Sequence, residues 1–214
     1  MADGYAFGYP KECDKCKNPS LSVITGPKVM PFFKEGSGPR LMLVGQDPTI
    51  YRKPERVKYV LMLNEENGQL SRWLTSLLGE DNYRRAEIYA TNLIKCSFAA
   101  PPSLAEHGGY SLLLSYFENC KSHLYLELTN YRPSVVLVFG EPGHRMFKSI
   151  LDNSDQIADS MREAFTGEFV RAMFANLDFD YSPCLHIKTY RVADTYGEKV
   201  RAFNSCIRKY FGGL

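Results

Sequence analysis

The sequence predicts a three-layer α/β/α domain with a central, mostly parallel, four-stranded sheet. Short, uninterrupted apolar runs are typical of strands buried on both faces, and here they alternate with segments of helical periodicity. Of the 214 residues, 44% are hydrophobic, the proportion of a packed globular protein. We therefore expect a single domain over residues 1–214, in which residues 1–40 form an N-terminal loop region and residues 41–214 form the core.

Four apolar runs carry the sheet prediction. The expected strands are Leu41–Val44, Ile88–Ile94, Val135–Phe139 and Pro183–Lys188. Four helices are expected between and after them, near residues 70–78, 110–129, 142–151 and 200–211. Gly79 closes the first helix, and Pro142 suits the first turn of the third. Residues 154–180 fit no single pattern, and residues 18–40, rich in Pro, Gly and Ser, are expected to wrap the surface.

The expected arrangement also indicates where a ligand binds. In open parallel sheets the ligand lies beyond the carboxyl ends of the strands. The residues just after Val44 and Phe139, those at the end of the strand that contains Tyr89, and those around His186 are therefore expected to converge.

The first strand is followed directly by Gly45-Gln46-Asp47-Pro48-Thr49. The glycine allows a sharp exit and the proline stiffens the turn, so the acid is held at the sheet edge. An ordinary turn that uses aspartate as a turn former is the alternative. The segment resembles the first motif of uracil-DNA glycosylases. This resemblance implies that Asp47 orients the attacking water and stabilises the departing sugar, and that Gly45 and Gln46 help to hold the base.

The second motif, from Thr91 to Cys96, reads Thr-Asn-Leu-Ile-Lys-Cys. It resembles a segment of the iron–sulfur branch (family 4-like) of the uracil-DNA glycosylase superfamily, which implies that Asn92 reads the flipped base. An asparagine amide offers one acceptor and two donors, so it can pair with the O4 and N3–H edge of uracil. Asn64 is a rival reader, and a strand-end cap is the structural alternative for Asn92.

Four of the six cysteines form a pattern: Cys13 and Cys16 in a C-x-x-C, Cys96 after the asparagine motif, and Cys120 in the next helix. Neither a signal peptide nor a membrane span is visible in the sequence, so we expect a cytoplasmic protein, whose thiols stay reduced. Four thiolates suit a [4Fe–4S] cluster or structural zinc. The resemblance favours iron, with a structural role that fastens the N-terminal loop to the core.

His186 lies on the expected last strand, where members of the superfamily carry His-Pro-Ser. The resemblance implies that His186 hydrogen-bonds the uracil O2 as negative charge develops on the leaving base. A satisfied core histidine is the alternative. The next residues, Ile187 and Lys188, depart from the pattern. A further departure is Leu63, which aligns near the aromatic that stacks on uracil; Tyr51 or Tyr59 are candidate substitutes.

The resemblance implies a DNA glycosylase of base-excision repair that hydrolyses the N-glycosidic bond of uracil, or of a related damaged base, flipped out of DNA. DNA is the expected partner, without a membrane or a protein partner; the net charge of +2 permits this but does not demand it. The departures at Thr49, Leu63 and Ile187 motivate a second hypothesis, a superfamily member that binds DNA or a nucleotide without excision. A structural zinc protein unrelated to repair is a third.

Overall fold

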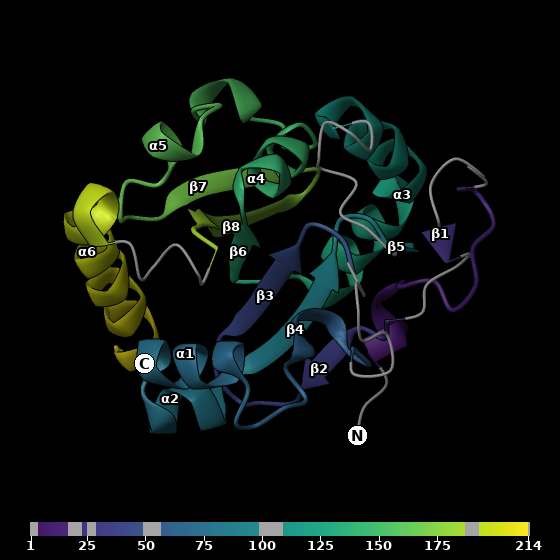
Figure 1. The fold of residues 1–214 in the computed structure, drawn as a ribbon. Helices are drawn as coiled ribbons and strands as arrows, with labels where there is room; N and C mark the ends of the chain where they lie inside the picture. The colour runs from purple at the N-terminus through teal and green to yellow at the C-terminus, as the bar shows by residue number, and fades with distance from the viewer. Residues whose placement is uncertain are drawn as a thin grey trace.

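The computed structural model describes residues 4–16, 23–24, 29–48, 57–98, 109–186 and 193–213, and within these ranges six strands form one sheet (Figure 1). Their order across the sheet is β2-β4-β3-β6-β8-β7. Their bounds are β2 Phe32–Lys34, β3 Arg40–Gly45, β4 Glu87–Asn92, β6 Val135–Phe139, β7 Val170–Phe174 and β8 Leu177–Cys184. The four inner strands run parallel, and β2 and β7 pair antiparallel at the two edges. The predicted parallel centre is confirmed.

Both edge strands were missed by the sequence prediction. β2 lies in the stretch that was expected to wrap the surface, and it is only three half-buried residues long. β7 lies in the segment without a clear pattern and forms a hairpin with β8, whose turn places Ala175 at φ 51°. The prediction for the last strand was also displaced, since β8 ends at Cys184, and His186 follows its end. A short ladder of β1 (Val23–Ile24) with β5 (Ser97–Phe98) lies outside the main sheet.

The helices follow the expected order, with additions. The described elements are α1 Gln69–Leu78, α2 Glu80–Arg85, α3 Gly109–Tyr131, α4 Glu141–Lys148, α5 Met161–Ala164 and α6 Ala193–Gly212, with the 3₁₀ turns η1 Gly4–Phe7, η2 Val60–Met62 and η4 Ser154–Gln156. As predicted, α1 ends at Gly79, and Pro142 lies in the first turn of α4. The short helices α2 and α5 were not predicted.

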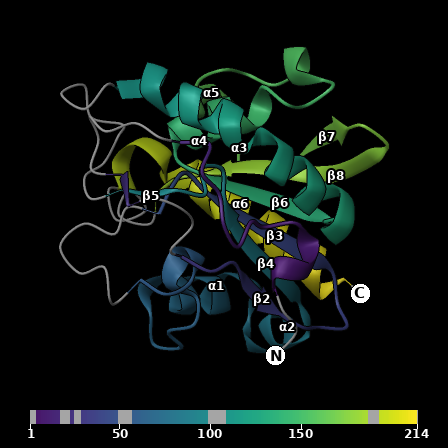
Figure 2. The same cartoon turned by 90° about the vertical axis from the view of Figure 1, so that its right-hand side faces the viewer.

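Side chains that alternate along the strands divide the core into two layers. Leu41 and Leu43 of β3 pack with the apolar faces of α1 and α6, whereas Met42 and Val44 pack with α3 and α4. This alternation follows from the two-residue period of a strand. Figure 2 shows α3 and α4 on one side of the sheet and α1 and α2 on the other. The three-layer α/β/α fold is therefore confirmed. In the described part of the chain, no helix has the length and apolarity needed to cross a bilayer.

One histidine, His144, is buried in this core. His144 of α4 is fully buried, with Nδ1 2.5 Å from the Tyr181 hydroxyl and Nε2 2.8 Å from the Ala158 carbonyl. Because a carbonyl only accepts, the proton lies on Nε2, and Nδ1 accepts a hydrogen bond from Tyr181. Burial lowers the pKa of His144, so the folded state prefers the neutral ring.

We predict that His144 makes the fold sensitive to acid. Since its pKa in the folded protein lies below the unfolded value of about 6.5, its contribution to stability is complete above pH ~6.5 and is lost as the pH falls toward the folded value. Urea unfolding between pH 7.5 and pH 5.5 measures this effect. The variant His144→Gln should be less stable at pH 7.5 and should lose less stability on acidification. An equal loss in both proteins would contradict the prediction.

Candidate active site

The carboxyl ends of the four parallel strands lie at one edge of the sheet. Gly45 at the end of β3 is opposite Asn92 at the end of β4, and Phe139 of β6 is opposite Cys184 of β8. The predicted candidate residues follow these ends. This shared edge is therefore the candidate active site.

Gly45 and Asn92 are in direct contact. A Cβ placed on Gly45 would lie 2.3 Å from Asn92 Oδ1 and 3.2 Å from Leu61 Cδ2, so any side chain at this position must displace the Asn92 amide. The backbone holds the same junction, because the Leu93 amide donates to the Gly45 carbonyl (2.9 Å) and the Ile94 amide donates to the Gln46 carbonyl (3.0 Å). The first and second motifs are thus one continuous structural unit.

Asp47 lies directly after this junction and is half-buried. Gln46 Nε2 donates a hydrogen bond of 2.5 Å to Asp47 Oδ1, which orients the carboxylate. The backbone that follows is tied down as well, since the Phe98 amide donates to the Pro48 carbonyl (3.3 Å). The carboxylate is therefore fixed at the sheet edge and remains partly accessible to solvent.

A strained turn covers the other side of Gly45. Leu61 and Met62, both in η2, have φ values of 57° and 53°. Two successive bulky residues in the left-handed region cost about 1–3 kcal/mol each, and such strain tends to occur at functional sites. The turn brings the Leu61 side chain against Gly45. Leu61, which the sequence did not single out, is thus the apolar neighbour of the site.

The residues considered as base stackers, and the rival base reader, lie elsewhere. Leu63 is 3% exposed and belongs to the core that packs on α1. Tyr59 and the exposed Asn64 line a cleft of about 860 Å³ between the β2 edge and the helices α1 and α2. The rival base reader Asn64 therefore faces a different surface from Asp47. Thr49 and Tyr51 lie outside the described residues.

His186 is exposed and lies two residues past the end of β8. The Gly140 amide donates to the Cys184 carbonyl (2.9 Å), so the ends of β6 and β8 stay paired up to this point. Asn92 and the end of β8 are three strand spacings apart across the sheet, or about 14 Å. For one small ligand to contact both residues, the Asn92 and His186 side chains must extend toward each other over the ends of β3 and β6. Ile187 and Lys188 lie outside the described residues.

Three of the four predicted thiols converge. Hydrogen bonds from the Cys120 and Cys96 thiols lower the pKa of Cys16, while the bond with Cys16 raises the pKa of Cys96 and Cys120. The half-buried Cys13 also raises the pKa of Cys96, through charge repulsion. Within the described ranges no three or more His, Cys, Asp or Glu side chains already have the arrangement of a metal site.

Polar groups surround these thiols. The Lys95 amide donates to Cys120 Sγ (3.4 Å), and Asn119 Nδ2 donates to Cys16 Sγ (3.5 Å). Hydrogen bonds to sulfur of this kind accompany thiolate-bound clusters and tune them. The contacting thiols and the donors around them are of the chemical kind that a thiolate-bound metal group needs, whereas their arrangement within the described residues is not that of a metal site.

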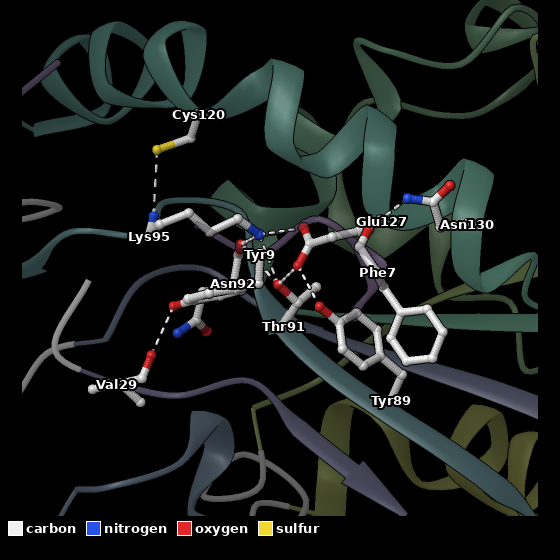
Figure 3. Close-up of polar contacts among 10 residues, drawn as sticks. All are labelled: Phe7, Tyr9, Val29, Tyr89, Thr91, Asn92, Lys95, Cys120, Glu127 and Asn130. Atoms are coloured by element: carbon white, nitrogen blue, oxygen red, sulfur yellow. Dashed lines mark hydrogen bonds and ion pairs between the residues drawn. The ribbon is translucent and has the colours of Figure 1, made fainter. Parts of the chain in front are cut away.

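A buried ion pair lies between the thiols and the sheet edge (Figure 3). Lys95 and Glu127 have fully buried side chains, and Lys95 Nζ is 2.5 Å from Glu127 Oε2. The other carboxylate oxygen, Oε1, accepts from the Tyr89 and Thr91 hydroxyls, both at 2.6 Å. Burial and the Glu127 carboxylate raise the pKa of Tyr89, so its hydroxyl stays protonated and serves as the donor.

The sequence profile of the Uracil DNA glycosylase superfamily matches residues 33–193, which is most of the chain. This chain belongs to the uracil DNA glycosylase superfamily. The match includes the Gly45–Asp47 segment, Asn92 and His186, whereas Cys13 and Cys16 precede it. No curated protein matches the chain.

The ion pair was not predicted from the sequence of this superfamily member, although a signal was present. Along α3 the apolar stripe runs through Leu124, Leu128 and Tyr131, and Glu127 lies on the same buried stripe. A carboxylate there needs a buried cationic partner. Lys95, in the middle of the second motif, is that partner.

We predict that Gly45→Ala lowers the free energy of unfolding by about 1–3 kcal/mol, the usual cost of overpacking, because the new methyl group must displace Asn92. Gly143→Ala in α4 is the matched control, since its methyl group would meet Val138 at an ordinary 3.4 Å. That change should leave stability unchanged or raise it. Urea unfolding of the two variants beside wild type measures both effects, and equal stability of Gly45→Ala and wild type would refute the close packing.

Proposed function

We propose that the protein is a DNA glycosylase that hydrolyses the N-glycosidic bond of uracil, or of a related damaged base, flipped out of DNA. The observation that supports this proposal is the junction of Gly45 with Asn92, which joins the first and second motifs at one edge of the sheet in a member of this superfamily. An enzyme that acts on a base must remove it from the stack. In this proposal the flipped-out base binds at the shared carboxyl edge of the parallel strands.

In the proposed mechanism Asp47 acts on the sugar side of the bond. As the base departs, the sugar becomes a cation with oxocarbenium character, which a fixed carboxylate stabilises most strongly in a site with little water. The Gln46 amide orients Asp47 before the substrate arrives, so no reorganisation is needed at that moment. The same carboxylate can accept a proton from the attacking water.

In the same proposal Asn92 and His186 act on the base. The Asn92 amide can donate to O4 of uracil and accept from N3–H, a pattern that the amino group of cytosine does not match. His186, exposed at the end of β8, donates to the uracil O2 as the leaving base becomes an anion. Positive charge or a hydrogen-bond donor at that oxygen lowers the barrier to bond cleavage.

We also propose that Cys13, Cys16, Cys96 and Cys120 hold a [4Fe–4S] cluster. Support comes from the contact of Cys16 with Cys96 and Cys120, and from the hydrogen bonds that reach two of the sulfurs. When bound, the cluster supplies a structural cross-link between the N-terminal segment, the end of β4 and α3. Thiolates of this kind require a reducing compartment, which agrees with a cytoplasmic protein.

The excision proposal predicts that the wild-type protein releases uracil from single- or double-stranded oligonucleotides that contain one uracil, and that EDTA does not inhibit it. Asp47→Asn and Asn92→Ala should each lower the single-turnover rate by about 10²-fold or more, and His186→Ala should lower it similarly. Alkali-labile cleavage of a labelled strand measures the rate.

Asp81→Asn is the control for these variants, because Asp81 is an exposed acid on α2, away from the sheet edge. Its rate should equal that of wild type. If wild type binds the uracil oligonucleotide tightly but forms no abasic product, the protein is a binding member of the superfamily, and the excision proposal fails.

The cluster proposal predicts a brown protein after anaerobic purification, with absorbance near 400 nm and about four irons per chain. Cys16→Ser should lose the colour and the iron. Cys206→Ser should keep both, since Cys206 lies on α6 on the opposite face of the sheet from α3. Colourless protein with about one zinc per chain would contradict the iron assignment.

A further inference from the structure

The Lys95 ammonium group has a full set of hydrogen bonds in a site without water access. It donates to Glu127 Oε2 (2.5 Å), to Thr91 Oγ1 (2.7 Å) and to the Asn92 carbonyl (2.5 Å), which uses all three of its N–H groups (Figure 3). The Tyr9 ring lies over it, with the centroid 4.9 Å from Nζ. Lys95 is thus held in one position by four neighbours.

Stability alone does not account for this ion pair. Removing two charges from water costs several kcal/mol, and apolar replacements of a buried pair are often neutral or stabilising. A buried pair is better explained where it fixes a geometry that apolar packing would leave variable.

Two of the three Lys95 hydrogen bonds go to the residues at the end of β4. The Asn92 carbonyl belongs to the last residue of β4, and a buried carbonyl without a partner costs free energy. Lys95 is the nearer of its two donors, since Thr91 Oγ1 lies 3.4 Å away, and the next amide, that of Leu93, donates to the Gly45 carbonyl. The peptide after Asn92 is therefore fixed from both sides, which also fixes the direction in which the Asn92 side chain leaves the backbone.

We propose that Lys95 is a positioning residue for Asn92, and that Glu127 of α3 holds Lys95 in the place where it does this. The inference rests on the proposed function, in which Asn92 reads the base. Lys95 touches neither base nor sugar in this role. It acts by holding the Asn92–Leu93 peptide against Gly45, because a displacement of about 1 Å at a reacting centre can reduce the rate about 10²-fold.

Lys95 also connects the end of β4 to the thiols. The Lys95 amide donates to Cys120 Sγ, and Glu127 lies seven residues after Cys120 on the buried stripe of α3. Tyr9 covers the Lys95 ammonium group, and its hydroxyl donates to the Val29 carbonyl (2.9 Å). A displacement of α3 therefore reaches the Asn92 carbonyl through a chain of direct contacts.

The test is the double variant Lys95→Met/Glu127→Leu, which removes both charges and keeps the volume. Its control is Lys121→Met/Glu118→Leu, which makes the same replacements at a solvent-exposed pair on α3. Circular dichroism and thermal unfolding establish that each protein folds. If the double variant does not fold, Glu127→Gln takes its place, because it keeps the shape, removes the charge and replaces one acceptor oxygen by an amide donor.

Three measurements are made on each folded protein. Amide hydrogen exchange by NMR reports the Leu93 and Ile94 amides, which should exchange at least about 10-fold faster in the double variant, while the β6 amides keep their protection. The single-turnover excision rate should fall about 10²-fold, while the Kd for a uracil oligonucleotide, measured in an Asp47→Asn background, stays within about 3-fold. The control should match wild type in all three.

Unchanged exchange of Leu93 and Ile94 in the folded variant would overturn the inference, and so would an unchanged excision rate. A loss confined to Kd would overturn it as well, since a positioning residue acts on the chemical step. If wild type excises no base, the proposed function fails separately. The exchange measurement then decides alone whether Lys95 and Glu127 fix the end of β4.

Discussion

The parallel pairing of β3 with β4 is the constraint on which the candidate site depends. The register runs from Arg40 opposite Glu87 to Gly45 opposite Asn92. A slip of one residue would turn every side chain of one strand to the other face, so burial on both faces of the sheet holds this register. Gly45, which has no side chain, leaves the space that the Asn92 amide occupies. The position of Asp47 two residues later follows from the same alignment.

Around this junction the N-terminal segment forms an integral part of the core. The Phe7 ring packs edge-on against Phe33, Tyr89 and Tyr131, with centroids 5.0–5.2 Å away. Gly8 approaches Leu126 of α3 so closely that a Cβ would lie 2.6 Å from the Leu126 Cβ. The segment is therefore fastened by aromatic packing as well as by the contacts of Cys16. A cluster would add to an attachment that the apolar core already provides.

Much of the sheet could be predicted from the sequence, because the runs at Leu41–Val44 and Val135–Phe139 are apolar throughout and have the length of buried strands. The edge strands could not. β2 is three half-buried residues long and stabilised by its pairing with β4, and tertiary contacts of this kind leave no periodic pattern in a short segment. The position of α1 was predictable because Gly79 provides a stop signal at its end.

Part of the candidate site could also be predicted, where local sequence patterns indicate it. The proximity of Gly45 and Asn92 follows from the rule that parallel strands end at one edge. The roles of Asp47, Asn92 and His186 remain predictions. The Lys95–Glu127 pair joins residues 32 positions apart, and no local pattern links them. Leu61 was missed because its contact with Gly45 depends on a left-handed turn that its sequence does not favour.

The most direct test of the account is a crystal structure of the Asp47→Asn variant, purified without oxygen, with a single-stranded oligonucleotide that contains one uracil. The account predicts a uracil at the carboxyl edge of the sheet, with the Asn92 amide about 2.9 Å from its O4 or N3. A uracil bound instead in the cleft beside β2, in contact with Asn64 or Tyr59, would contradict the central claim that Asn92 reads the base.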